Sequence, residues 1–155
     1  MLIMIAAVSE NNVIGNSQLD KMPWRCSEEL QFFKGETMGA TLVMGSVTAT
    51  QVGKLPGRDA IVLSRDPTFT LPGFTTMNME TFLTFASGND TTFYICGGGE
   101  IYNLLMPYLN KAIISHMNFK ADGDIFLPPL DKDWETVEEI VFENFTVITK
   151  RPPMW

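Results

Sequence analysis

The chain has 155 residues, 45% of them hydrophobic and 19% charged. That length suits one domain with a full hydrophobic core, because a chain of about 150 residues buries close to 70% of its surface on folding. The 18 Asp and Glu residues outnumber the 11 Lys and Arg residues and give a net charge of −7. Such a negative field repels phosphate backbones and anionic lipids, so we expect neither a nucleic acid nor a membrane as a partner.

The two cysteines, Cys26 and Cys96, are too few for a disulfide framework and lack the spacing of metal ligands. They are expected to be free thiols in a reducing compartment. The apolar residues 1–8 are short for a signal peptide and follow no basic segment, and no stretch approaches the ~20 apolar residues that cross a bilayer. These features predict a soluble, cytoplasmic protein that forms one domain over residues 1–155 and holds no metal.

The first half of the chain predicts strands that alternate with helices. Residues 1–8 form a short, unbroken apolar run, as in a strand that is buried on both faces, and the polar residues 9–20 predict a long loop. Ser27, followed by acidic residues, predicts the N-cap of a helix that ends between Gly35 and Gly39. Two further strands are expected at residues 41–44 and 60–63, with a short helix at residues 46–52, closed by Gly53, between them.

The second half of the chain continues this alternation. Apolar residues at helical spacing predict a helix over residues 79–86. Strands are expected at residues 93–96, 111–117, 135–141 and 145–149, with a helix at residues 100–109. The whole pattern predicts an α/β fold, in which helices flank a mostly parallel central sheet that ends in an antiparallel C-terminal strand.

Ligands of open α/β sheets collect beyond the carboxyl ends of the strands. This rule selects five segments as candidate site positions, residues 6–7, 45–48, 64–65, 97–99 and 115–116. The glycines at residues 97–99 stand between a predicted buried strand and a helix, where backbone N–H groups could approach a pyrophosphate. They do not form the GxGxxG fingerprint, however, and tight strand-to-helix turns use glycines for conformational reasons alone.

Glu29 lies in the first turn of a predicted helix that is otherwise lined by apolar residues. Helical spacing lets it share a face with Phe32 and Phe33, at i+3 and i+4. Such a carboxylate either faces solvent and offsets the helix dipole or is buried against a ligand, and the sequence leaves both open. The adjacent Glu28 is expected to face solvent.

His116 is the only histidine, and no cysteine cluster or GxSxG motif accompanies it. Zinc-dependent hydrolysis and serine-triad chemistry therefore lack their required groups, and His116 is expected to be a structural residue of a buried strand. Arg58 and Arg65 occupy predicted turns of an acidic chain. Each is either a solvated surface charge or an anchor for an anionic ligand.

Several short stretches, weak one by one, follow one another in a specific order. They comprise residues 5–8, 13–15, 22–24, 29–34, 43–45, 55–58, 61–65, 97–102 and 122–124, together with Thr48, Phe126 and Pro128. In this order and at this spacing, the chain resembles the dihydrofolate reductase family over essentially its whole length. The resemblance implies reduction of 7,8-dihydrofolate to 5,6,7,8-tetrahydrofolate by hydride transfer from NADPH, a step of one-carbon and thymidylate metabolism.

The resemblance places Glu29 at the family's acidic active-site position. Its carboxylate would bind the 2-amino group and N3 of the pterin, a two-donor edge that matches two carboxylate oxygens, with the Ser115 hydroxyl as its partner. Met22, at the end of the loop that would close over the nicotinamide, and Trp24 are the other implied catalytic residues, and Arg58 would pair with the glutamate tail of the folate. The remaining implied substrate contacts are the backbone carbonyls of Ile5 and Cys96 and the side chains of Ala7, Leu30, Phe33, Val52 and Leu55.

The resemblance also implies a cleft for NADPH. Its residues are Ala7, Ile14, Gly15, Gly45, Ser46, Thr48, Leu63, Ser64, Arg65, Cys96, Gly97, Gly98, Gly99, Glu100, Ile101 and Tyr102. The family has a cis peptide bond at the position of Gly97 and Gly98. The chain departs from the family where basic residues are frequent, since Ser46 and Glu100 stand there. Arg65 is then the main cation expected at the cofactor's 2′-phosphate, so we expect NADPH to be preferred over NADH by less than in relatives with several cations.

Two alternative functions stay open on the sequence. One is a reductase of the same architecture that acts on a pyrimidine or another pteridine, as in riboflavin synthesis, although Glu29 and Arg58 suit a pterin with a glutamate tail. The other is a catalytically idle relative that uses the fold for binding or structure. The expected partners are dihydrofolate and antifolate inhibitors, bound by a monomer.

Overall fold

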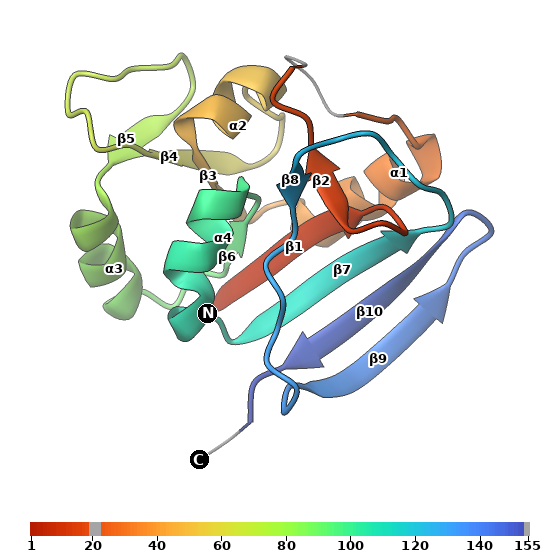
Figure 1. The fold of residues 1–155 in the computed structure, drawn as a ribbon. Helices are drawn as coiled ribbons and strands as arrows, with labels where there is room; N and C mark the ends of the chain where they lie inside the picture. The colour runs from red at the N-terminus through yellow and green to blue at the C-terminus, as the bar shows by residue number, and fades with distance from the viewer. Residues whose placement is uncertain (19–22, 154–155) are drawn as a thin grey trace.

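The computed structural model describes residues 1–18 and 23–153 of the chain. Within these residues, the main element is an eight-stranded sheet in the order β5-β4-β3-β6-β1-β7-β10-β9 (Figure 1). Its strands are β1 (Leu2–Val8), β3 (Thr41–Gly45), β4 (Asp59–Leu63), β5 (Thr75–Met77), β6 (Phe93–Ile95), β7 (Lys111–Met117), β9 (Glu135–Val141) and β10 (Phe145–Arg151). A separate two-stranded ladder joins β2 (Val13–Gly15) to β8 (Ile125–Phe126).

The sheet is parallel from β5 to β7 and antiparallel at its C-terminal end. β1 pairs in parallel with β6 and β7, and β3 pairs in parallel with β4 and β6. β10 runs antiparallel to both β7 and β9. This arrangement confirms the predicted fold class, and it gathers the carboxyl ends of β1, β3, β4, β6 and β7 along one edge of the sheet.

Helices cover both faces of the sheet (Figure 1). They are α1 (Ser27–Thr37), α2 (Ser46–Val52), α3 (Met79–Ser87), α4 (Gly99–Leu105) and the short 3₁₀ helix η1 (Met106–Tyr108). Phe32 and Phe33 of α1 and Ala49 of α2 pack on one apolar cluster, whereas Phe82 of α3 and Leu105 of α4 belong to the cluster on the other face. The two faces explain why the central strands are continuous apolar runs. No helix of the described residues is long and apolar enough to cross a membrane.

Three short strands were not predicted from the sequence. β2 lies inside the segment predicted as a long loop over residues 9–20, and β5 and β8 were not expected either. A local hydrogen bond stabilises the turn into β2, since Val13 N donates to Ser9 Oγ at 2.9 Å. Asn12 in this turn has a left-handed backbone conformation, with a φ of 67°. Strands of two or three residues show no readable periodicity, and their pairing partners lie far away in the chain.

Helix ends differ from the prediction at two points. Ser27 does not cap α1, because Cys26 takes the N-cap position and makes no side-chain cap hydrogen bond. The helix predicted over residues 100–109 ends at Leu105, and η1 follows it. Pro107 lies within η1 and has no N–H to continue the α-helical pattern.

His116 is exposed, so the expectation of a buried histidine is wrong. The strand alternates its side chains between the two faces of the sheet. Ala112 and Ile114 share the face of His116 and are buried among the α3–α4 cluster. His116 follows Ile114 by two residues on that face and is exposed.

Candidate active site

Glu29 and Ser115 meet between α1 and the central sheet. Ser115 is buried on β7, opposite Ala7 of β1 in the parallel ladder. Because Ile5, Ala7, Ile113 and Ser115 alternate onto the face that α1 covers, the first turn of α1 lies over them. The Ser115 hydroxyl donates a hydrogen bond to the Glu29 carboxylate. The structure therefore brings together the two residues that the resemblance pairs.

Apolar surroundings change the acidity of Glu29. Burial raises the pKa of the Glu29 carboxyl above its ordinary value, and the hydrogen bond from Ser115 offsets part of that rise. Of the two orientations that the sequence left open, the structure selects the partly buried one. A carboxyl with a raised pKa can hold a proton closer to neutral pH than an exposed glutamate does.

The neighbouring Glu28 also differs from its expected orientation. One of its carboxylate oxygens is buried and has no hydrogen-bond partner among the described residues. The expectation that Glu28 faces solvent is therefore wrong for this oxygen.

The polar groups beside Glu29 stay neutral. The Tyr102 hydroxyl donates to the Ile5 carbonyl at 2.8 Å, and burial together with the negative charge of Glu29 holds the pKa of Tyr102 well above its ordinary value. Cys96 follows β6, and burial raises the pKa of its enclosed thiol to about 12. Among Glu29, Cys96 and Tyr102, only Glu29 can exchange a proton near neutral pH, because the pKa values of the thiol and the phenol are raised far above that range.

Arg58 is buried, with 7% of its surface exposed, although the sequence also allowed a solvated charge. Its Nε donates to the Pro56 carbonyl at 3.1 Å and its Nη1 to Thr37 Oγ1 at 3.2 Å. The guanidinium carbon lies 6.0 Å from the centroid of the Phe33 ring. Phe33 follows Glu29 by four residues, about one turn, on the same helix. Arg58 therefore places a fixed positive charge beside α1.

Apolar side chains surround the Glu29 and Arg58 groups. Phe33, Leu55 and Trp24 are partly buried in the α1-side cluster, and the Trp24 ring meets Phe119 edge to face at 5.5 Å. Leu30 and Val52 remain 44% and 41% exposed. Leucine and valine with that much free surface suit contact with an apolar ligand.

Glycines hold the carboxyl ends of β3 and β6 in close contact. Gly45 N donates to the Gly97 carbonyl at 2.8 Å. A Cβ on Gly45 would approach Ile101 to 3.0 Å, and one on Gly98 would approach Thr48 Oγ1 to 3.3 Å. Gly97 has a φ of +107°, which side chains rarely tolerate, and its peptide bond to Gly98 is cis. Backbone, rather than side chains, thus forms the surface of this turn.

Arg65 and Glu100 face each other across the same edge. Arg65 lies just beyond β4 and Glu100 in the first turn of α4, and the Arg65 guanidinium forms an ion pair with the Glu100 carboxylate. Both side chains are highly exposed, at 86% and 64%. The neighbouring Ser64 accepts a hydrogen bond from Asp66 N at 3.1 Å, so its hydroxyl helps to shape the turn after Leu63.

The β2–β8 ladder brings Ile14 and Gly15 near the glycine turn. A Cβ on Gly99 would lie 4.0 Å from Ile14, and a Cβ on Gly15 would lie 3.1 Å from Ile125. After β2, the Ser17 hydroxyl donates to the Asp124 carboxylate and Ser17 N donates to Asp124 Oδ1 at 2.8 Å, and these hydrogen bonds lower the pKa of Asp124. Met22, which the resemblance places in a lid, lies outside the described residues.

Sequence reasoning did not single out Thr37 or Asp124 as site residues. Thr37 is completely buried, and its hydroxyl donates to the Phe33 carbonyl at 2.8 Å while accepting from Arg58. A threonine at the end of a helix gives no local signal of such a role. Asp124 lay within a matched stretch, but only the folded chain brings it to Ser17.

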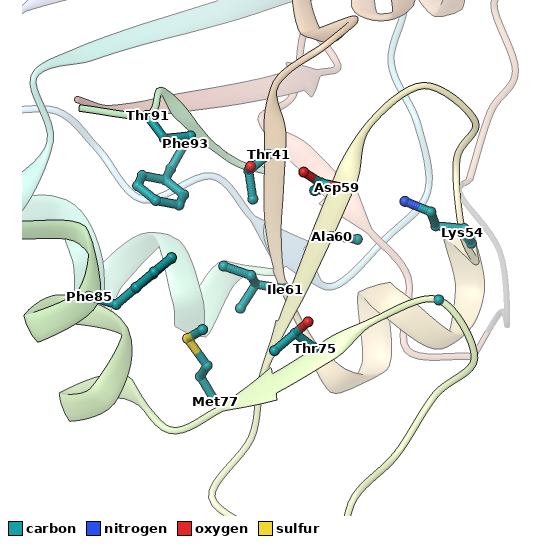
Figure 2. A pocket seen from close by; sticks show the side chains of 11 residues that line it. Thr41, Lys54, Asp59, Ala60, Ile61, Thr75, Met77, Phe85, Thr91 and Phe93 are labelled. Carbon is teal, nitrogen blue, oxygen red and sulfur yellow. The ribbon is translucent and has the colours of Figure 1, made fainter. Parts of the chain in front are cut away.

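A cavity of about 420 Å³ lies at the opposite edge of the sheet, at the amino ends of the strands (Figure 2). Lys54 and Asp59 stand on one side of it, and Phe85 and Phe93 on the other. The Lys54 ammonium donates to the Arg58 carbonyl, so it supports the main chain there. None of the predicted site residues that the structure describes lines this cavity. The chemistry, rather than the cavity, therefore identifies the candidate site at the carboxyl edge.

The comparisons with known proteins identify the family of the chain. The family model described as dihydrofolate reductase matches residues 1–147. A dihydrofolate reductase of Neisseria meningitidis is 34% identical, over 88% of this chain and 85% of the relative. The type A13 dihydrofolate reductase of Escherichia coli is 30% identical, over 97% of this chain and 94% of the relative. The solved dihydrofolate reductase of Enterococcus faecalis, complexed with NADP(H) and RAB-propyl, superposes with a TM-score of 0.89 at 30% identity, covering 97% and 95% of the two chains.

The fold is that of an open α/β sheet, and the candidate site lies along the carboxyl edge of this sheet, between a partly buried carboxylate and a glycine turn. The family match and the relatives, which the chain covers nearly from end to end, make the assignment specific. The chain belongs to the dihydrofolate reductase family, and by that membership it is an NADPH-dependent oxidoreductase.

Proposed function

We propose that the chain reduces 7,8-dihydrofolate to 5,6,7,8-tetrahydrofolate with NADPH, and that Glu29 is the one ionisable side chain that acts on the pterin. The carrying observation is the partly buried Glu29 carboxyl with a raised pKa, hydrogen-bonded to Ser115. Its two oxygens match the two donors of the pterin, the 2-amino group and N3. Ser115 fixes the orientation of the carboxylate, because its own position on β7 is buried.

Glu29 also holds the proton that the reaction needs. Reduction adds a hydride at C6 of the pterin, and N5 must then gain a proton. Bound NADPH supplies the hydride. A carboxyl whose pKa is raised by burial is protonated in a larger fraction of molecules at a given pH than an exposed glutamate is, and this proton is delivered toward N5, through water if the distance requires it. Tyr102 stays neutral and holds the Ile5 carbonyl, one lone pair of which remains for a pterin amino group.

The buried Arg58 supports a substrate with an anionic tail. A guanidinium has five N–H donors, and two of them bind Pro56 and Thr37. The other donors suit a carboxylate in the bidentate geometry that arginine prefers. This feature favours a folate over a pyrimidine or a riboflavin precursor, because those substrates lack the glutamate tail.

The glycine turn supports a dinucleotide at the other end of the edge. A Cβ at Gly45 or Gly98 would crowd Ile101 or Thr48, so glycine allows a close approach of chain segments at this turn, as in the turns that bring backbone N–H groups to a pyrophosphate. The residues that would hold the cofactor are those of this turn, together with Ile14, Thr48 and the Ser64–Arg65 segment. These residues argue against a catalytically idle relative that uses the fold only for binding or structure, since each position carries a group that can contact the cofactor.

We further infer that the chain works as a single domain and a monomer in the cytoplasm. The two free, unpaired cysteines suit a reducing compartment. One apolar cluster on each face of one continuous sheet suits one cooperative domain. Size-exclusion chromatography with light scattering should give a mass near 17.3 kDa. A stable mass of twice that value would contradict the monomer.

The proposed function is tested by Glu29→Gln, which keeps the shape and removes the charge. Hydride transfer at pH 7, followed by the loss of NADPH absorbance in single turnovers, should slow by roughly 10²–10⁴-fold. For the wild type we expect the rate to rise toward low pH, as Glu29 gains its proton, and this rise should be absent from the variant. Turnover of dihydrofolate at the wild-type rate by Glu29→Gln would refute the role of Glu29, and a wild-type protein that reduces no dihydrofolate would refute the function.

A further inference from the structure

The order of the strands places Arg65 and Glu100 at the adenosine end of the cofactor, an inference that rests on the proposed function. Glu29 and Ser115 lie on the side of β1 and β7, whereas β3 and β4 lie beyond β6 on the other side of β1. A dinucleotide that brings its nicotinamide to the Glu29 side extends across the ends of β6 and β3. Its adenosine half then lies over the end of β4, where Arg65 stands.

Charge at this end of the edge is mostly negative. The segments after β3, β4 and β6 (residues 45–48, 64–68 and 96–102) contain one cation, Arg65, and two carboxylates, Asp66 and Glu100. Arg65 is paired with Glu100. The Asp66 carboxylate has a different task, because it accepts hydrogen bonds from Thr68 N at 2.9 Å and Thr68 Oγ1 at 2.7 Å.

The Arg65–Glu100 pair meets the two nicotinamide dinucleotides differently. A 2′-phosphate brings about −1.5 to −2 charges, so it must take Arg65 away from Glu100 and then lie near an unpaired carboxylate. A 2′-hydroxyl carries no charge and donates a hydrogen bond, and an acidic residue is the group by which dinucleotide-binding folds hold the ribose of NAD. An exposed ion pair is weakly held and screened by salt, so either exchange is open to it.

We propose that Arg65 and Glu100 together recognise either form of the adenosine ribose, the one with a 2′-phosphate and the one with a 2′-hydroxyl. The chain is then a reductase that uses NADH as well as NADPH. Glu100 accepts a hydrogen bond from the 2′-hydroxyl of NADH while Arg65 stays paired with it. Arg65 instead binds the 2′-phosphate of NADPH after leaving Glu100. The reaction balances in the same way with either cofactor, since dihydrofolate gains a hydride at C6 and a proton at N5 while NADH leaves as NAD⁺.

Direct binding tests this proposal without relying on turnover. Titration calorimetry would give the Kd of NADPH, NADH, adenosine 2′,5′-bisphosphate and 5′-AMP for the wild type and for Glu100→Gln, Arg65→Gln and Asp66→Asn. Glu100→Gln should tighten NADPH and the bisphosphate by roughly 3–10-fold and weaken NADH by roughly 3–10-fold. Arg65→Gln should weaken NADPH and the bisphosphate by roughly 10–100-fold and change NADH by less than about 2-fold.

Asp66→Asn is the matched control. It removes one negative charge at the same edge but leaves the Arg65–Glu100 pair in place, so it should shift the affinity for NADPH by less than Glu100→Gln does and leave NADH unchanged. Circular dichroism should show all three variants folded, because the side chains of Arg65 and Glu100 are exposed. The ratio of kcat/KM values for NADPH and NADH should change in the same order as the ratio of Kd values.

Three results would overturn the proposal. They are an unchanged affinity of Glu100→Gln for NADH, equal effects of Glu100→Gln and Asp66→Asn on NADPH, and a wild type that binds NADPH but not NADH. The first would remove Glu100 from the ribose, and the second would reduce its role to long-range repulsion. Because the Kd values are measured without dihydrofolate, a failure to reduce that substrate counts against the proposed function alone, and the binding ratios still decide the role of the pair.

Discussion

Arg58→Leu should separate binding of the folate tail from binding of the pterin. The guanidinium is buried, and its hydrogen bonds to Pro56 and Thr37 fix its plane. Five N–H donors minus these two leave three, enough for both oxygens of one carboxylate. A lost charge-assisted pair typically costs about 1.5–3 kcal/mol, which corresponds to an increase in Kd of about 10–150-fold.

The assay compares ligands that carry a glutamate with one that does not. Dihydrofolate and methotrexate should each lose roughly 10–150-fold in affinity for Arg58→Leu, whereas trimethoprim, which has no glutamate, should stay within about 3-fold. Quenching of tryptophan fluorescence measures each Kd, and urea unfolding measures the stability of each variant. The stability measurement is needed because Arg58 also contacts Thr37 and Phe33.

Two further variants show whether geometry or charge matters. Arg58→Lys keeps the charge but loses the planar fork, so tailed ligands should bind with intermediate affinity. Thr37→Val removes the hydroxyl that accepts from Arg58 Nη1, so it should weaken tailed ligands by a smaller factor and spare trimethoprim. Equal losses for methotrexate and trimethoprim in a folded Arg58→Leu variant would refute the reasoning and leave Arg58 a purely structural role.

Three more expectations follow from the same contacts. Glu29→Gln should raise the free energy of unfolding at pH 7, because the folded state raises the pKa of Glu29 and so disfavours its ionised form. This gain should disappear below pH 4.5, the ordinary pKa, where the carboxyl is protonated in both the folded and the unfolded state. Urea unfolding across pH measures the difference in stability, and a difference that stays constant with pH would contradict the reasoning. Asp124→Asn should accelerate hydrogen exchange of the Ser17 amide by roughly 10-fold, while Asp66→Asn should leave it unchanged. Phe82→Ala should lower the free energy of unfolding by about 3–5 kcal/mol, since the ring is fully buried against Phe93. It should leave the KM for dihydrofolate unaltered, because Phe82 packs on the face of the sheet away from Glu29. A changed KM would contradict the assignment of the core residue and the site to opposite faces of the sheet.

Local pattern was enough for the longer elements. The apolar runs that became β1, β3, β4 and β7 and the glycine that closes α2 carry their signal within a few residues. Their alternation with helices also determined the parallel sheet and its antiparallel end. β2, β5 and β8 could not be predicted in this way, because a strand of two or three residues exists only through the partner that it pairs with.

The chemistry of Glu29 was half determined by the sequence. Its place in the first turn of α1 follows from the residues around it, but either orientation was compatible with that place. The choice came from β7, which carries Ser115 to the same point and closes the surroundings that raise the pKa of the carboxyl. Desolvation depends on every group packed nearby, and no local pattern encodes it.

The two arginines show what the sequence determined and what only the tertiary structure decided. The sequence identified both as the candidate anion anchors of an acidic chain and identified Glu100 as a departure from the family. The structure buried Arg58 against Thr37 and left Arg65 exposed in a pair with Glu100, 35 positions away. Composition and spacing determine which charges a chain has, whereas their burial and partners depend on which distant segments the sheet brings side by side.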